Sequence, residues 1–164
     1  VADRTVPGHW EGDLVMGGHN RSAVGTLVER SSRYVLLAPL QTKDAASVRQ
    51  AFAREIKALP THLRRSMTYD QGKEMSEHKL FTEQTNMIVY FAHPHSPWER
   101  GTNENTNGLI RQFLPKGRDL SKVPPDEIKR IQDLLNGRPR KTLHWRTPNE
   151  VMTDLIGQNV AIDS

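Results

Sequence analysis

Three short β-type segments follow one another near the start of the chain, and this order constrains the fold more than any other feature. They cover residues 9–16, 23–28 and 34–40 and are separated by two polar turns that contain glycine, asparagine or serine. Closely spaced strands of this kind pair as antiparallel neighbours. The sequence therefore predicts that a sheet begins with an antiparallel three-strand meander.

Helical and strand-like segments alternate after the meander. Apolar residues at spacings of three and four predict an amphipathic helix over residues 44–59, and strands are predicted over 66–69 and 87–91, with a helix over 76–84 between them. Alternation of this type favours parallel pairing, so we expect the later strands to run parallel to the first. The predicted fold class is α/β, with a mixed five-stranded sheet flanked by helices.

Three further helices are expected in the second half of the chain. The sequence Ser96-Pro97-Trp98-Glu99 has the residue types of a capping box, so a helix is predicted to begin at Ser96. A second helix is predicted over 125–135, and a last one after Thr147, where Glu150 completes another capping box. No internal repeat interrupts this order, and 164 residues suit one domain, so we expect residues 1–164 to form a single domain.

Composition excludes several classes of protein. No apolar run approaches the ~18 residues of a membrane span, and the first residues show no signal-peptide pattern. The chain contains no cysteine, so disulfides, a thiol nucleophile and cysteine-ligated zinc are excluded, and a reducing compartment is expected. Because the first residue is Val, we also expect the chain to be a piece of a longer protein.

Positive charge is concentrated in the second half of the chain. The net charge is +4, but residues 93–146 hold 11 basic and 6 acidic side chains, which gives this segment +5 and leaves the remainder at −1. A basic segment of this size fits a polyanionic partner such as nucleic acid, although a solvated basic face explains a mild excess nearly as well.

Two aspartates lie where strands would not normally place them. Asp13 falls inside the apolar run of the first strand, where an unpaired buried carboxylate is costly. Asp70 ends a predicted strand, and ligands of α/β proteins bind at the carboxyl ends of strands. The alternatives are a salt bridge or an outward position for Asp13 and a turn-capping role for Asp70.

A third carboxylate, Glu104, lies in a predicted helix that is rich in glycine, threonine and asparagine. Such residues each cost roughly 0.5–1 kcal/mol of helix propensity relative to alanine, so packing or function must favour them here. Helical spacing places Arg100, Asn107 and Arg111 on the same helix face as Glu104. The alternative is a solvated face with an Arg100–Glu104 ion pair.

Three carboxylates on a strand, a strand end and a helix could bind two divalent cations. Oxygen ligands suit Mg²⁺ and Mn²⁺. A pair of such ions can stabilise both the attacking and the leaving oxygen in phosphoryl transfer. Together with the basic flank, this arrangement predicts DNA or RNA as the substrate.

Five sequence motifs resemble one known family. They are Pro7 to Leu14, Gly25 to Arg30, Asp70 to Met75, His95 to Asn105 and Arg138 to Leu143. Their order and spacing resemble the catalytic domain of IS30-family insertion-sequence transposases, which belong to the DDE transposase and integrase superfamily and have an RNase H-like fold. The 33 residues between Asp70 and Glu104 match the spacing in that family.

The resemblance implies a metal-dependent transposase. Asp13, Asp70 and Glu104 would be the catalytic, metal-binding triad for Mg²⁺ or Mn²⁺, with two ions expected; Glu99 is the competing glutamate, but its capping position and spacing disfavour it. The partners implied are DNA, as element ends and target, and further copies of the chain in the full-length complex, with no membrane. The expected location is the bacterial cytoplasm, in association with the nucleoid.

Residues expected to contact DNA surround the triad or lie in the basic segment: Lys73, Arg100, Asn103, Asn107, Arg111, Lys116, Arg118, Arg138, Arg140 and Lys141. The three tryptophans, Trp10, Trp98 and Trp145, could stack on bases, but packing roles are favoured for them. Family members carry an N-terminal helix-turn-helix region that has no counterpart in this sequence, so the chain is not expected to find its terminal repeats. Two alternatives remain open: a catalytically idle DNA-binding domain, and a nuclease of the same fold.

Overall fold

The protein folds around one five-stranded sheet. The computed structural model describes residues 6–40, 42–70, 77–92 and 101–163. The strands are β1 (His9–Met16), β2 (Ala23–Glu29), β3 (Val35–Pro39), β4 (Ser66–Asp70) and β5 (Ile88–Ala92). Their spatial order is β3-β2-β1-β4-β5, with β1, β2 and β3 antiparallel and β4 and β5 parallel to β1. The predicted meander and the predicted parallel strands are both confirmed.

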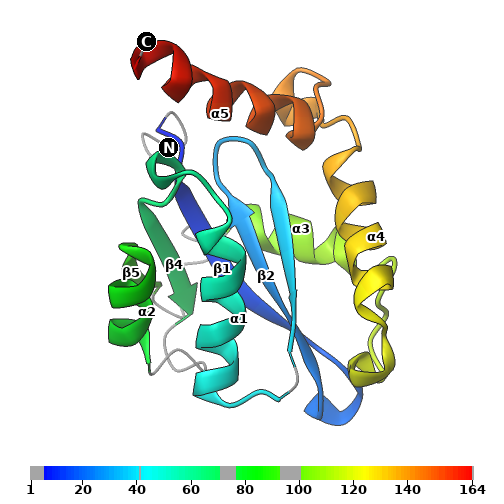
Figure 1. The fold of residues 1–164 in the computed structure, drawn as a ribbon. Coiled ribbons are helices and arrows are strands. Elements are labelled where there is room, and N and C mark those ends of the chain that lie inside the picture. The colour runs from blue at the N-terminus through cyan, green and yellow to red at the C-terminus, as the bar shows by residue number, and fades with distance from the viewer. Residues whose placement is uncertain (1–5, 41, 71–76, 93–100, 164) are drawn as a thin grey trace.

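Helices cover both faces of this sheet. They are α1 (Ala45–Lys57), α2 (His78–Thr85), α3 (Gly101–Ile110), α4 (Pro125–Asn136) and α5 (Pro148–Asp163). In Figure 1, α1 crosses in front of the strands, α3 lies behind them, and α4 runs along the side of β3. The sheet is therefore the middle layer, with separate helices on each side.

Local sequence explains where two of the helices begin. The Asp44 carboxylate accepts a hydrogen bond from the backbone N–H of Ser47, which caps α1. Before α5, Thr147 and Glu150 each accept a hydrogen bond from the other's backbone N–H, as the predicted capping box requires. The capping box predicted at Ser96 lies outside the described residues.

Alternate residues of β1 point to opposite faces of the sheet. Trp10 and Leu14 enter the apolar cluster on the α1 side, which also holds Phe52 and Tyr69. Val15 enters the second cluster, which the sheet forms with α3 and α4. Odd-numbered residues of β1 therefore face α3, and the charged residues of the strand share that face.

The tryptophan predictions have mixed outcomes. Trp10 is fully buried and donates a hydrogen bond from its indole Nε1 to the Leu63 carbonyl oxygen 2.8 Å away, so its packing role is confirmed. The packing role predicted for Trp145 is wrong, because its side chain is 68% exposed. Trp145 follows His144 in a turn where both residues have positive φ, and this turn directs the ring away from the core. Trp98 lies outside the described residues.

The outer edge of β3 is closed by two amide side chains of α4. The side-chain oxygens of Gln132 and Asn136 accept hydrogen bonds from the backbone N–H groups of Leu37 and Val35, at 2.9 and 2.8 Å. Asn136 also donates to the Val35 carbonyl oxygen at 2.9 Å. These contacts satisfy edge groups that would otherwise be available to pair with another strand.

Candidate active site

Asp13 is fixed between its own strand and helix α3. Its half-buried carboxylate accepts a hydrogen bond from the backbone N–H of Leu14 through Oδ1, at 2.8 Å, and one from Asn107 Nδ2 through Oδ2, at 3.0 Å. Asn107 is on α3, so the helix contributes directly to the environment of this aspartate.

Asp70 is the last residue of β4, which lies beside β1. Glu11 of β1 pairs with Thr68 of β4, and continuing this parallel register by two residues sets Asp70 next to Asp13 in the sheet. Only the backbone of Asp70 is described, and the same is true of Glu104. The structure thus brings the two aspartates to neighbouring strands without describing the second carboxylate.

Glu104 lies in α3, the helix that packs on β1. It occupies the position one helical turn before Asn107, whose side chain contacts Asp13. The three predicted triad residues therefore belong to β1, to its neighbouring strand β4 and to α3, the helix that packs on β1.

Sequence reasoning missed Glu11, a second carboxylate on the same face as Asp13. Glu11 is only 1% exposed, and Arg30 from the end of the β2 hairpin places its Nε 3.3 Å from the glutamate Oε2. Below it on β1, His9 Nδ1 lies 2.6 Å from the hydroxyl of Ser66 on β4. A row of polar groups therefore leads along β1 to Asp13.

The predicted DNA-contacting residues differ in their surroundings. Lys116 and Lys141 are exposed, whereas the Arg118 guanidinium donates to both carboxylate oxygens of Glu127, at 3.2 and 3.1 Å. Arg111 Nη1 donates to the Leu114 carbonyl oxygen at 3.3 Å. Arg118 is thus held in one orientation by a carboxylate, and the two lysines are accessible to a polyanion.

The remaining predicted DNA contacts are partly described. Arg138 is half-buried. The partial burial of Arg140 itself, together with the nearby positive charge of Arg138, lowers the pKa of the Arg140 guanidinium. Arg140 Nη2 donates to the Leu135 carbonyl oxygen at 3.3 Å. Lys73 and Arg100 lie outside the described residues, and the side chain of Asn103 is not described either.

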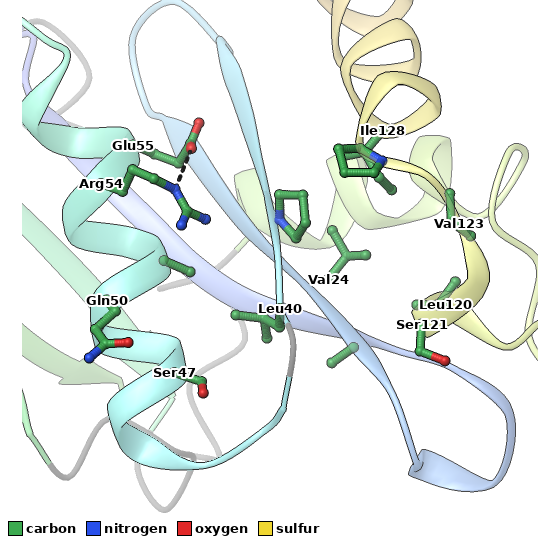
Figure 2. Close-up of a pocket in the computed structure, with 14 residues that line it drawn as sticks. Val24, Leu40, Ser47, Gln50, Arg54, Glu55, Leu120, Ser121, Val123 and Ile128 are labelled. Carbon is green, nitrogen blue, oxygen red and sulfur yellow. Dashed lines mark ion pairs between the residues drawn. The ribbon is translucent and has the colours of Figure 1, made fainter.

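A groove of about 760 Å³ lies elsewhere, between α1 and the segment that leads into α4. Figure 2 shows its lining, which includes Leu40, Val24 and the Arg54–Glu55 ion pair, with 3.7 Å between Nε and Oε2. None of its lining residues is a predicted site residue. The groove is therefore separate from the polar row on β1.

The described residues at Asp13 suit a hard divalent cation. Within the described side chains, which do not include those of Asp70 and Glu104, no group of three His, Asp or Glu residues is close enough to hold a metal ion. The Asn107 Oδ1 atom beside Asp13 is buried, and no described group donates a hydrogen bond to it. A carboxylate and a buried amide oxygen without a donor match the oxygen ligands and hydration waters of Mg²⁺ and Mn²⁺.

The fold and the position of Asp13 agree with a known class of DNA-processing domain. The model of the integrase core domain family matches residues 3–97, and the chain belongs to this family. Its mixed sheet of three antiparallel and two parallel strands is the RNase H-like fold of that family.

Several curated relatives are transposases of insertion sequences. The chain is 53% identical to the transposase of IS1086 from Cupriavidus metallidurans over 95% of its length, and 49% identical to the IS30A transposase InsI from Escherichia coli over 93%. A transposase of IS4351 from Bacteroides fragilis is 39% identical over 93% of the chain. These matches confirm the resemblance to IS30-family transposases. The chain spans 46%, 39% and 46% of these three relatives, which is less than half of each.

The helices that the structure describes include none with the length and apolar character that crossing a membrane requires.

Proposed function

We propose that this chain is the catalytic domain of a DNA transposase that cuts and joins DNA at the ends of an insertion sequence. The observation that carries the proposal is the position of Asp13, half-buried on the central strand of an integrase-core sheet and hydrogen-bonded to α3. The transposases of IS1086 and IS30A, to which the chain is similar over almost its whole length, support the same activity.

The reaction proposed is two successive phosphoryl transfers. In the first, water attacks a phosphodiester at the element end and the bond to the 3′ oxygen breaks, which leaves a free 3′-hydroxyl and a 5′-phosphate. In the second, that 3′-hydroxyl attacks a phosphodiester of target DNA and loses its proton to solvent, and the displaced target 3′ oxygen takes up a proton from solvent to become a hydroxyl. No oxidant or energy source is required, because the first step is a hydrolysis and in the second step one phosphodiester replaces another.

Asp13, Asp70 and Glu104 would hold Mg²⁺ or Mn²⁺, with two ions proposed, and the metal would stabilise charge on the attacking and leaving oxygens. The parts of the chain around them position the reactants. Asn107 holds the Asp13 carboxylate, and the exposed lysines near the end of α3 and in the C-terminal segment contact the DNA backbone. The ten residues predicted to contact DNA remain proposals for this role.

Three further parts of the proposal concern context. DNA is the partner, as element end and target, and several copies of the full-length protein assemble on it. The protein acts in the bacterial cytoplasm at the nucleoid. Residues 1–164 act as one catalytic unit, which binds DNA weakly and with little sequence preference because its proposed contacts are to the phosphate backbone.

The direct test measures joining of DNA ends by the chain with Mn²⁺. Short duplexes with recessed 3′-hydroxyl ends are incubated with plasmid DNA, and Asp13→Asn is compared with Asp133→Asn, which changes an exposed carboxylate on α4. We expect Asp13→Asn to abolish joining without lowering the unfolding temperature, and Asp133→Asn to leave joining unchanged. Products that are cut and never joined would identify a nuclease, and binding without either reaction would identify an idle domain.

The DNA contacts are tested separately by titrating affinity against salt. Binding of lysine and arginine side chains to phosphates releases counterions, so DNA affinity falls as salt is added. Each contact that is lost makes the plot of log affinity against log salt shallower by about one unit of slope. We expect this for Arg111→Ala, on duplexes of any sequence, but not for Arg54→Ala on the distant groove. Identical slopes for Arg111→Ala and the parent chain would remove Arg111 from the proposed DNA surface.

A further inference from the structure

Helix α3 contributes an amide to the environment of Asp13 as well as the predicted Glu104. The Nδ2 group of Asn107 donates to Asp13 Oδ2 at 3.0 Å, while Asp13 Oδ1 accepts from the backbone N–H of Leu14 at 2.8 Å. Both oxygens of the carboxylate therefore accept a hydrogen bond, and the Asn107 contact ties its orientation to α3. An ionised carboxylate accepts and cannot donate, so only the nitrogen end of the amide suits this position.

The other end of the same amide lacks a described donor. Asn107 Oδ1 is buried, and none of the described groups donates a hydrogen bond to it. Buried polar atoms are normally hydrogen-bonded, and an exception calls for an explanation such as an ion or water that joins the site. The unmatched oxygen belongs to the same amide group whose nitrogen contacts Asp13, so a water or ion bound to it would lie next to the Asp13 carboxylate.

Packing does not account for asparagine at this position. Among the α3 side chains that the structure describes, Thr106 and Ile110 are buried, whereas Asn107 is only half-buried. Asparagine is also a poorer helix former than alanine or leucine. A purely structural position here would favour a better helix former, so the hydrogen-bonding groups of the side chain are the feature that matters.

We infer that Asn107 is a positioning residue of the metal site, acting through Asp13 and through a water in the hydration shell of the bound cation. Its Nδ2 sets the orientation of the Asp13 carboxylate, and its Oδ1 accepts a hydrogen bond from that water. Mg²⁺ and Mn²⁺ keep several waters when bound to proteins, so a fixed acceptor beside the ligand stabilises the hydrated ion. The inference rests on the proposed function, and it gives Asn107 a role distinct from the DNA contact predicted for it.

The test measures Mn²⁺ affinity by titration calorimetry and electron paramagnetic resonance, together with the unfolding temperature in chelator. Asn107→Leu keeps the size of the side chain and removes both hydrogen-bonding groups. We expect a 10-fold to 100-fold loss of Mn²⁺ affinity, the range seen when residues that orient a ligand are removed, with little change in the unfolding temperature without metal. Gln112→Leu, at an exposed position just after α3, is the control and should bind Mn²⁺ like the parent.

Asn107→Asp keeps the test decisive if the leucine variant does not fold. A second carboxylate beside Asp13 repels it, so the metal-free protein should unfold at a lower temperature than the parent, and Mn²⁺ should raise that temperature by more. Parental Mn²⁺ affinity in Asn107→Leu, or a metal-induced rise in Asn107→Asp no greater than the parent's, would overturn the inference. If Asn107→Leu loses Mn²⁺ affinity but the parent chain never joins DNA ends, the proposed function fails and the inference stands.

Discussion

Arg30 lies against the buried Glu11 carboxylate, with 3.3 Å between Nε and Oε2, on the sheet face that carries Asp13. Arg30→Leu removes one partner and leaves a carboxylate that is 1% exposed with less compensation. We expect a loss of about 2 kcal/mol in the free energy of unfolding, the scale of a hydrogen bond to a charged group. Urea unfolding measures this loss, and Arg54→Leu, which removes a more exposed cation, is the control.

A double-mutant cycle separates this pair from other effects of the substitutions. Glu11→Gln and Arg30→Leu should each destabilise the fold, and the double variant should lose less than the sum of the two. Strictly additive losses would show that Arg30 does not compensate Glu11.

The closed edge of β3 leads to a second prediction. Gln132→Leu keeps the size of the side chain but leaves the backbone N–H of Leu37 without its acceptor. Leaving a buried donor unsatisfied costs about 1–3 kcal/mol, so the free energy of unfolding should fall by that amount. Lys129→Leu breaks an exposed ion pair with Asp133 on the same helix and should change stability by less than about 0.5 kcal/mol. Equal effects of the two substitutions would contradict the role assigned to Gln132.

Two glycines should respond to alanine in opposite directions. A Cβ at Gly25 of β2 would lie 2.6 Å from Phe52 Cε1, so Gly25→Ala forces the ring to shift and should destabilise the protein by about 1–3 kcal/mol. A Cβ at Gly108 of α3 would meet nothing within 4 Å. Gly108→Ala should therefore stabilise the protein by up to about 1 kcal/mol, through helix propensity. Thermal unfolding of both variants checks the pair, and a stabilising Gly25→Ala would show that the sheet and α1 are less tightly packed than described.

The pH dependence of stability should differ between two glutamates. Burial raises the pKa of the Glu55 carboxyl in the groove, although the Arg54 charge partly opposes this. A raised folded-state pKa gives stability that is present below the unfolded pKa and is lost as pH rises through the folded value. Glu55→Gln should therefore be more stable than the parent at pH about 7, and the difference should vanish below pH about 4.

Glu150 should show the opposite pH dependence of stability, because its pKa is lowered in the folded protein. The hydrogen bond from the Thr147 backbone N–H and a second one with the Thr147 side chain lower the pKa of the Glu150 carboxyl. The ionised Glu150 carboxylate therefore stabilises the fold at pH values above its unfolded-state pKa, and this stabilisation is lost as the pH falls through its folded-state pKa. Glu150→Gln should be less stable than the parent at neutral pH and equal to it in acid. Urea unfolding at several pH values measures both glutamates, and a shift of the same sign in the two variants would contradict the assignment.

Most of the fold could be predicted from periodicity because the strands are short, apolar and punctuated by polar turns. Asp13 stood out because aspartate is unusual inside an apolar strand. Glu11 did not stand out. It follows the apolar Trp10 in the strand, and a polar residue that alternates with apolar ones is normally predicted to face solvent. Its burial depends on Arg30, which is distant in sequence and reaches it only when β2 folds back along β1.

The amides of α4 were missed for a related reason. Gln132 and Asn136 interrupt the apolar stripe that includes Ile128 and Leu135, and a polar residue on such a stripe is usually taken as its margin. Their function appears only when β3 is known to be an edge strand beside that helix. Spacing along one helix could not indicate this, because the acceptors serve backbone groups about a hundred residues earlier.

The alternation of side chains along β1 limits how this strand can evolve. Trp10 and Leu14 anchor one side of the sheet while Glu11 and Asp13 face the other. Deleting Gly12 would move Trp10 and Glu11 to the opposite faces relative to Asp13 and Leu14, which would place a carboxylate in the apolar cluster under α1 and an aromatic ring toward α3. Single replacements in β1 therefore preserve this alternation, whereas a deletion inside the strand removes the Trp10 anchor and the buried Glu11–Arg30 pair in one step.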